Sequence, residues 1–170
     1  MAKEFFDIYD DAGNRIGTAL RSECHGNPAL LHRTAHVVVI HPDTGDILLQ
    51  KRKMTKDIQP GKWDTAVGGH VSYGETLLEA TFREASEELG LTAFNPVFLT
   101  SYVFESEVER ELVNVFAAVG SFELKPDLDE VDEGRWWPID EVNANMGKGI
   151  FTPNFESEFT SIEKKLLALL

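Results

Sequence analysis

One amphipathic segment, between Thr76 and Leu89, constrains this chain more than any other feature. Apolar residues recur in it at helical spacing, and at about 100° per residue they fall within about 60° of one another. These residues are Leu78, Phe82, Ala85 and Leu89. Gly90 follows, at a position where helices often end. The sequence therefore predicts a helix that packs this face against the rest of the chain.

Three glutamates, Glu84, Glu87 and Glu88, fall on the opposite side of the predicted helix. They repel one another, and the helix macrodipole disfavours each near the C-terminal end by roughly 0.3–1 kcal/mol. The preceding Gly68-Gly69 allows the backbone to approach a ligand closely. The glutamates form either a solvated acidic face or a site for a divalent cation, and carboxylate oxygens suit Mg²⁺ or Mn²⁺.

The residues around this helix resemble the Nudix box at every position. The pattern is Gly69, five residues, Glu75, seven residues, Arg83-Glu84-Ala85, one residue, Glu87-Glu88, one residue and Gly90-Leu91. The resemblance implies the α/β Nudix fold, in which a mixed β-sheet is sandwiched between α-helices and the box, residues 69–91, forms a loop-helix-loop. It also implies hydrolysis of a diphosphate linked to another moiety, with Mg²⁺ or Mn²⁺ as cofactor.

Diphosphate hydrolysis suggests a role for each acidic residue of the box. Cations held by Glu84, Glu87 and Glu88 would neutralise phosphate oxygens and lower the pKa of a bound water. We expect Glu88 to accept the proton of that water, although Nudix enzymes differ here and some use a glutamate from a distant loop. Arg83 is expected to orient the glutamates through charge-assisted hydrogen bonds. Glu75 is expected to assist the metals or to brace the loop.

Motifs outside the box are similar to those of the isopentenyl diphosphate isomerases, a branch of the same superfamily. They are Cys24-His25, His32-Arg33, the segment from Lys56 to His70, and Glu109-Arg110-Glu111. The resemblance implies a second metal site, whose ligands by motif position are His25, His32, His70, Glu109 and Glu111. Histidine ligands favour zinc, manganese or iron over magnesium. Each histidine alone would also fit a surface or core role.

The motifs leave three functions to distinguish. The isomerases carry a catalytic cysteine two residues before the histidine that corresponds to His70, whereas Gly68 occupies that position here and Cys24 is the single cysteine. Because all the box glutamates are present, the residues favour a hydrolase on an isomerase-like framework over an isomerase. The third function is a non-catalytic module that binds a nucleotide diphosphate. For the hydrolase, a nucleoside diphosphate or a small organic diphosphate is favoured over a long RNA.

Basic residues gather just before the box. Five of them lie within twelve residues: Lys51, Arg52, Lys53, Lys56 and Lys62. They form either a phosphate-facing rim or a solvated strand edge and loop, and Trp63 either stacks on a base or packs in the core. The guanidinium fork of Arg52 matches phosphate oxygens best. The candidate substrate-binding residues are Arg52, Lys51, Lys62, Trp63, Gly68 and Gly69.

Length and charge narrow the class of protein. The chain has 170 residues, 29 acidic and 16 basic, with a formal net charge of −13. This length predicts one domain spanning residues 1–170. The negative charge argues against binding nucleic acid or an anionic membrane, and one cysteine fits a reducing compartment. We expect a cytoplasmic enzyme that acts on a small-molecule diphosphate; dimers are common in such a family, so a homodimer is one expected state.

Turn residues divide the rest of the chain into short elements. A hairpin is predicted over about 4–21, a second joins 36–40 to 47–50, and a third pairs 97–104 with 112–119. Residues 135–137 predict a short strand, after which Asp140 is expected to cap a brief helix. Apolar residues at helical spacing predict an amphipathic helix over about 155–170.

Overall fold

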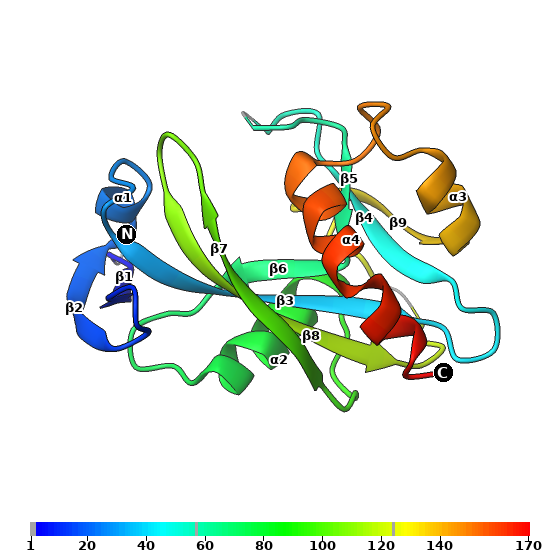
Figure 1. Ribbon diagram of the computed structural model, residues 1–170, viewed down its shortest axis with the longest axis horizontal. Coiled ribbons are helices and arrows are strands. Elements are labelled where there is room, and N and C mark those ends of the chain that lie inside the picture. The colour runs from blue at the N-terminus through cyan, green and yellow to red at the C-terminus, as the bar shows by residue number, and fades with distance from the viewer. Residues whose placement is uncertain (1–2, 57, 124) are drawn as a thin grey trace.

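The computed structural model describes residues 3–56, 58–123 and 125–170 (Figure 1). Within these residues, nine strands belong to one mixed sheet. They are β1 (Phe5–Tyr9), β2 (Arg15–Leu20), β3 (Leu31–Ile40), β4 (Ile47–Arg52), β5 (Trp63–Thr65), β6 (Val67–His70), β7 (Val97–Glu105), β8 (Arg110–Val119) and β9 (Val131–Trp137). The helices are α1 (Arg21–Cys24), α2 (Leu77–Leu89), α3 (Ile139–Ala144) and α4 (Pro153–Leu167).

Strand β3 is the centre of the sheet. It pairs in parallel with β8 along its whole length, from Leu31 opposite Arg110 to Ile40 opposite Val119. On its other side the antiparallel partner changes along the strand. That partner is β1 at Leu31 and His32, β6 from Thr34 to Val37, and β4 from Val39 onward. The sheet therefore opens between β6 and β4, next to the middle of β3.

The two faces of β3 pack against different helices. Val38 and Ile40 belong to a core cluster with residues of α4, whereas Val37 and Val39 belong to a second cluster with Ala85 and other residues of α2. Alternate residues of a strand point to opposite faces, so one short apolar run serves both cores. The mixed sheet with helices on both faces confirms the predicted α/β architecture.

Helix α2 is rotated relative to the prediction. Its ends agree well, because Thr76 caps it through Glu79 and Gly90 ends it with a φ of 66°. Leu78, however, is 50% exposed, and the buried side chains are Ala80, Thr81, Ala85 and Leu89. The predicted apolar face is thus partly wrong. The rotation turns Glu84 and Glu88 toward the sheet, where they find polar partners, instead of toward solvent.

Strands β5 and β6 and helix α1 were not predicted, and Gly68-Gly69 lie in β6 and not in the turn that the two glycines suggest. The remaining elements differ from the predictions mainly at their ends. Strands β1 and β2 form the expected N-terminal hairpin. Helix α3 begins at Ile139 after Pro138, so Asp140 lies inside the helix and is not its cap. Helix α4 runs from Pro153 to Leu167. It begins there because the Thr152 hydroxyl caps its N-terminus by accepting a hydrogen bond from Phe155 N. No helix in the described ranges is long and apolar enough to cross a bilayer.

Truncating the buried face of α4 should destabilise the whole domain. Phe159 is 1% exposed in the larger core cluster, so Phe159→Ala should lower the free energy of unfolding by about 3–5 kcal/mol. Urea denaturation followed by circular dichroism measures this loss. The matched control is Ser157→Ala on the exposed side of α4, which should change stability by less than about 0.5 kcal/mol.

Candidate active site

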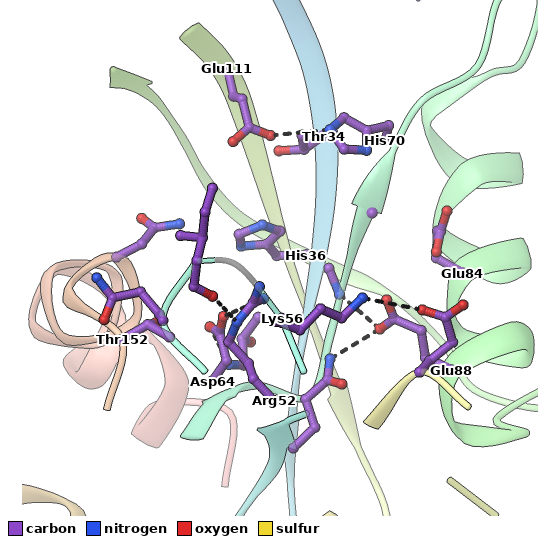
Figure 2. A pocket seen from close by; sticks show the side chains of 18 of the residues that line it. Thr34, His36, Arg52, Lys56, Asp64, His70, Glu84, Glu88, Glu111 and Thr152 are labelled. Carbon is purple, nitrogen blue, oxygen red and sulfur yellow. Dashed lines mark hydrogen bonds and ion pairs between the residues drawn. The ribbon is translucent and has the colours of Figure 1, made fainter. Parts of the chain in front are cut away.

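One large cavity, of about 1020 Å³, collects most of the predicted site residues. It lies where the sheet opens beside β3, and residues of α2, β6, β8 and α4 all contribute to its lining. Figure 2 shows Glu84 and Glu88 on the α2 side of this cavity, with His36 near its centre. The volume is at the upper end of the usual range for ligand sites.

The box glutamates Glu84 and Glu88 are held against β6. Glu88 Oε2 accepts hydrogen bonds from the backbone N–H of Gly68 at 3.2 Å and from Gln50 Nε2 at 3.1 Å. The Glu84 carboxyl group occupies the space that a side chain at position 69 would need. Glycine at position 69 therefore lets the helix bring this carboxylate close to the strand.

Arg83 connects the acidic groups of the box. Its guanidinium group forms a two-pronged contact with Glu75, at 2.7 and 3.0 Å, and a 2.7 Å contact with Glu84 Oε1. The same group lies 3.2 Å from Glu87 Oε2 and donates to the carbonyl oxygen of His70. Charge-assisted contacts of this kind are short and directional. Arg83 is therefore placed to orient the carboxylates, and the Glu87 side chain remains 58% exposed.

The electrostatics of this wall suit a divalent cation. Burial and the neighbouring Glu84 raise the pKa of Glu88 to about 8, against the opposing effect of Gly68 N–H, Gln50 and His36. Burial also raises the pKa of Glu84. Buried carboxylates that lack compensation hold protons at neutral pH. A divalent cation would supply that compensation, so the residues fit Mg²⁺ or Mn²⁺.

The predicted second metal cluster is assembled at one end of the cavity. His25, His32, His70 and Glu109 each offer a ligand atom, and these atoms lie within 4.8 Å of one another. Glu111 Oε2 is 3.8 Å from His70 Nε2 and 4.0 Å from His32 Nε2. Among the described residues, no other group of three or more potential metal-ligating side chains brings its ligand atoms this close together.

The state of His32 fits a transition metal. Its Nε2 is buried and has no hydrogen-bond partner in the described chain, while Nδ1 lies 3.5 Å from the carbonyl oxygen of Leu30. Burial lowers the pKa of His32 to about 4, so the ring is neutral at pH 7. The tautomer that donates Nδ1–H to Leu30 carries its free lone pair on Nε2. Phe6 of the N-terminal hairpin stacks on His32 and His70 at an interplanar angle of 11°, which supports the orientation of both rings.

The structure divides the predicted basic rim into two groups. Arg52 and Lys56 line the cavity; Arg52 Nη1 lies 3.9 Å from Asp64 Oδ2, and Lys56 Nζ lies 3.8 Å from Glu130 Oε2. Lys51 and Lys62 are not among the described lining residues. Trp63 is also outside the cavity: it packs edge-on against Trp137 in the larger core cluster. Of the two roles expected for Trp63, the structure shows the packing against the core.

A buried ion pair in the cavity was missed by the sequence analysis. His36 Nδ1 lies 2.8 Å from Glu158 Oε1, and the Tyr102 hydroxyl lies 2.8 Å from the same oxygen. Glu158 is only 3% exposed. His36 and Glu158 are 122 residues apart, so no local pattern joins them. The available signal was the position of Glu158 among the apolar residues on one face of the C-terminal helix.

The ion pair keeps His36 charged at neutral pH. Burial opposes protonation of the imidazole, but Glu158 outweighs burial, with smaller contributions from Asp64 and Glu111, and the pKa of His36 rises to about 9. The cavity therefore holds an imidazolium group next to the box.

Comparison with known proteins identifies the family. A NUDIX domain model matches residues 30–155. An uncharacterized Nudix hydrolase of Yersinia pestis is 37% identical over 153 residues, which cover 89% of this chain and 81% of the relative. The chain belongs to the Nudix hydrolase family, whose members act on pyrophosphate bonds and use divalent metal ions.

One further relative and one solved structure are similar to most of this chain. An isopentenyl-diphosphate Delta-isomerase of Cutibacterium acnes is 35% identical over 149 residues, covering 78% of this chain and 73% of the relative. Among solved structures, DR0079 from Deinococcus radiodurans aligns with a TM-score of 0.73 at 22% identity, covering 88% of this chain and 92% of that one. The likeness to DR0079 is one of fold.

Stability should depend on pH through His36. The pKa of this imidazole is 6.5 in the unfolded chain and about 9 in the fold, so its contribution is fully present below about pH 6.5 and is lost as the pH rises through 9. The loss should be on the order of 3 kcal/mol. Urea denaturation at several pH values measures it. Glu158→Gln removes the carboxylate that raises the pKa, so this variant should lose much less stability over the same range.

Gly69→Ala should weaken metal binding at the box. The added methyl group collides with the Glu84 carboxyl group and displaces it from the cavity wall. We expect Mn²⁺ affinity to fall by at least about tenfold, measured from the electron paramagnetic resonance signal of free Mn²⁺. The control is Gly17→Ala, where a methyl group meets open space. Unchanged Mn²⁺ binding in folded Gly69→Ala would mean that Glu84 is not a ligand.

Proposed function

We propose that this chain is a metal-dependent pyrophosphohydrolase that cleaves the diphosphate linkage of a nucleoside diphosphate derivative or another small organic diphosphate. The decisive observation is that Glu84 and Glu88 lie on the cavity wall, where Arg83 orients Glu84 and where Gly68 N–H and Gln50 orient Glu88. This arrangement supports Mg²⁺ or Mn²⁺ as the cofactor, with Glu84, Glu87 and Glu88 as its ligands.

The chain's own residues supply orientation and proton transfer. Bound divalent cations would neutralise phosphate oxygens and lower the pKa of water. Glu88, aligned by Gly68 N–H and Gln50, accepts the proton of the attacking water. Water adds to phosphorus and a P–O bond of the diphosphate bridge breaks, so that the products are two phosphate species. Arg83 and Glu75 keep the carboxylates in place throughout.

Arg52 and Lys56 are the proposed phosphate contacts. Both line the cavity, and their carboxylate partners lie at 3.9 and 3.8 Å, beyond good hydrogen-bond distance. The Nη1 group of Arg52 and Nζ of Lys56 can therefore turn to phosphate oxygens, while Arg52 Nε keeps its 3.1 Å hydrogen bond to the carbonyl oxygen of Ile58. Gly68 and Gly69 permit close approach of the substrate to β6. Lys51, Lys62 and Trp63 have no role in this arrangement.

The histidine and glutamate cluster is proposed to hold a second, transition metal ion. The buried Nε2 of His32, without a partner in the described chain, supports this assignment because an orphaned imidazole nitrogen is costly unless something binds it. The proposed ligands are His25, His32, His70, Glu109 and Glu111. Their nitrogen-rich set favours zinc, manganese or iron over magnesium.

The surroundings of Cys24 and of position 68 argue against isomerase activity. Cys24 is buried among apolar residues of the N-terminal hairpin, and burial raises its thiol pKa to about 11. Position 68 faces the His36 ring, and an added Cβ there would lie only 3.3 Å from His36 Cδ2. No described cysteine lines the cavity. A phosphate-release assay distinguishes hydrolysis from a non-catalytic binding role, because a binding module would release no phosphate.

Substitution of the proposed base should abolish turnover. Glu88→Gln keeps the size of the side chain but cannot take a proton, so metal-dependent phosphate release should fall by at least about 100-fold. The matched control is Glu79→Gln, an exposed residue of the same helix, which should keep wild-type activity. The assay screens diphosphates with Mg²⁺ and Mn²⁺, then repeats the best substrate in ¹⁸O water to locate the broken bond. Near-wild-type turnover of Glu88→Gln would reject Glu88 as the base.

Metal content should test the second site separately. Purified protein should retain about one transition metal ion per chain after dialysis against a weak chelator, measured by inductively coupled plasma mass spectrometry. His32→Gln should lose this ion, because the cluster loses its central nitrogen. His41→Asn, a change of a histidine outside the cavity lining, should retain it. Equal metal content in both variants would contradict the assignment.

A further inference from the structure

Strand β3 carries a polar stripe toward the cavity. His32, Thr34 and His36 alternate with other residues, so they project from the same face of the strand. His32 belongs to the candidate metal cluster, whereas Thr34 and His36 do not. Both residues line the cavity, and neither has a role in the hydrolysis proposed above.

Thr34 is the most informative member of the stripe. It is 2% exposed, and its hydroxyl group has no hydrogen-bond partner in the described chain. It pairs with His70 on β6 and with Val113 on β8. A buried hydroxyl without a partner is costly. A hydroxyl of this kind on a cavity wall is therefore matched to a polar ligand.

His36 presents a second unused donor. Glu158 engages Nδ1 at 2.8 Å, and no described residue hydrogen-bonds Nε2. The ring lies beside Gly68, so no side chain at that position covers its edge. Tyr102 and Glu158 hold the ring from the buried side. They are positioning residues, and His36 is the group that meets the cavity.

A carboxyl group and an amide group complete this end of the cavity. Asp64 from β5 and Asn154 from α4 both line it, and Asn154 Oδ1 lies 2.9 Å from the Tyr102 hydroxyl. Figure 2 shows His36 between Asp64 and Thr152 on one side and the box glutamates on the other, with Thr34 and Glu111 further along the cavity. Donors and acceptors are thus mixed within one region beside the proposed diphosphate position.

We propose that Thr34, His36, Asp64 and Asn154 form the subsite for the group attached to the diphosphate, and that this subsite takes a hydroxyl-bearing group, such as a sugar or polyol, in preference to a prenyl chain. Hydroxyl groups both donate and accept, so they satisfy this mixture. A prenyl chain would cover the same groups without replacing their hydrogen bonds to water. The inference rests on the proposed diphosphate hydrolysis and names its substrate class.

Two five-carbon diphosphates test the subsite directly. Ribose 5-diphosphate and isopentenyl diphosphate have the same reacting group, and the attached five-carbon group is a hydroxyl-bearing sugar in one and an apolar alkenyl chain in the other. Phosphate release with saturating Mg²⁺ should give the ribose compound a kcat/KM at least about tenfold higher, because unpaired polar groups penalise the apolar compound. A ratio near one, or a preference for isopentenyl diphosphate, overturns the inference while diphosphate hydrolysis itself stands.

Thr34→Val separates ligand recognition from structure. The substitution keeps the shape of the side chain and removes the unpartnered hydroxyl, so the melting temperature should stay the same or rise. The kcat/KM for ribose 5-diphosphate should fall by about fivefold, whereas that for isopentenyl diphosphate should not fall. His41→Asn, outside the cavity lining, should leave both values unchanged. Equal losses on both compounds would overturn the inference.

Replacing the ion pair should reverse the selectivity. In His36→Leu/Glu158→Leu, apolar residues replace both members of the buried pair, a change that proteins often tolerate. The preference should shift at least about tenfold toward isopentenyl diphosphate.

If no diphosphate is hydrolysed, the proposed function fails. Calorimetric titration of the wild type with ribose 5-phosphate and isopentenyl phosphate then compares the two groups without turnover, and equal affinity rejects the subsite.

Discussion

The placement of two carboxylates against the sheet is the constraint on which the site depends. Glu84 and Glu88 can reach β6 only because Gly69 leaves space and because Gly68 N–H and Gln50 donate hydrogen bonds. The same requirement explains why α2 buries small residues such as Ala80 and Ala85 and leaves Leu78 exposed. Burial brings these carboxyl groups into one wall, and the proposed divalent cation would compensate their charge there.

Strand β3 relates the parts of the cavity to one another. His32 belongs to the candidate transition-metal cluster. His36, four residues further along the strand, faces the box side of the cavity. The parallel partner β8 supplies Glu111 opposite His32, and the antiparallel partner β6 supplies Gly68 opposite His36. Strand registry therefore sets the spacing between the cluster, the box and the polar subsite, and a rigid strand keeps these distances constant.

The likeness to isopentenyl-diphosphate isomerases is one of framework, and the chemistry of the cavity differs. The cluster of histidines and glutamates is assembled as that resemblance implies. Gly68 replaces the expected thiol, and the ion pair of His36 with Glu158 occupies the adjoining wall. A charged, hydrogen-bonding wall next to a complete set of box glutamates supports the proposed attack by water on a polar diphosphate over proton transfer on an apolar chain.

The sequence by itself determined the box helix with its end at Gly90, the hairpins and the two sets of candidate ligands, because these depend on local spacing and short motifs. Only the tertiary structure decided the rotation of α2, which brings Glu84 and Glu88 to the sheet. It also decided that Arg52 and Lys56 line the cavity while Lys51, Lys62 and Trp63 do not. The pairing of His36 with Glu158 needed the fold as well. Packing sets helix rotation and strand registry sets distant contacts, and neither is encoded in a local pattern.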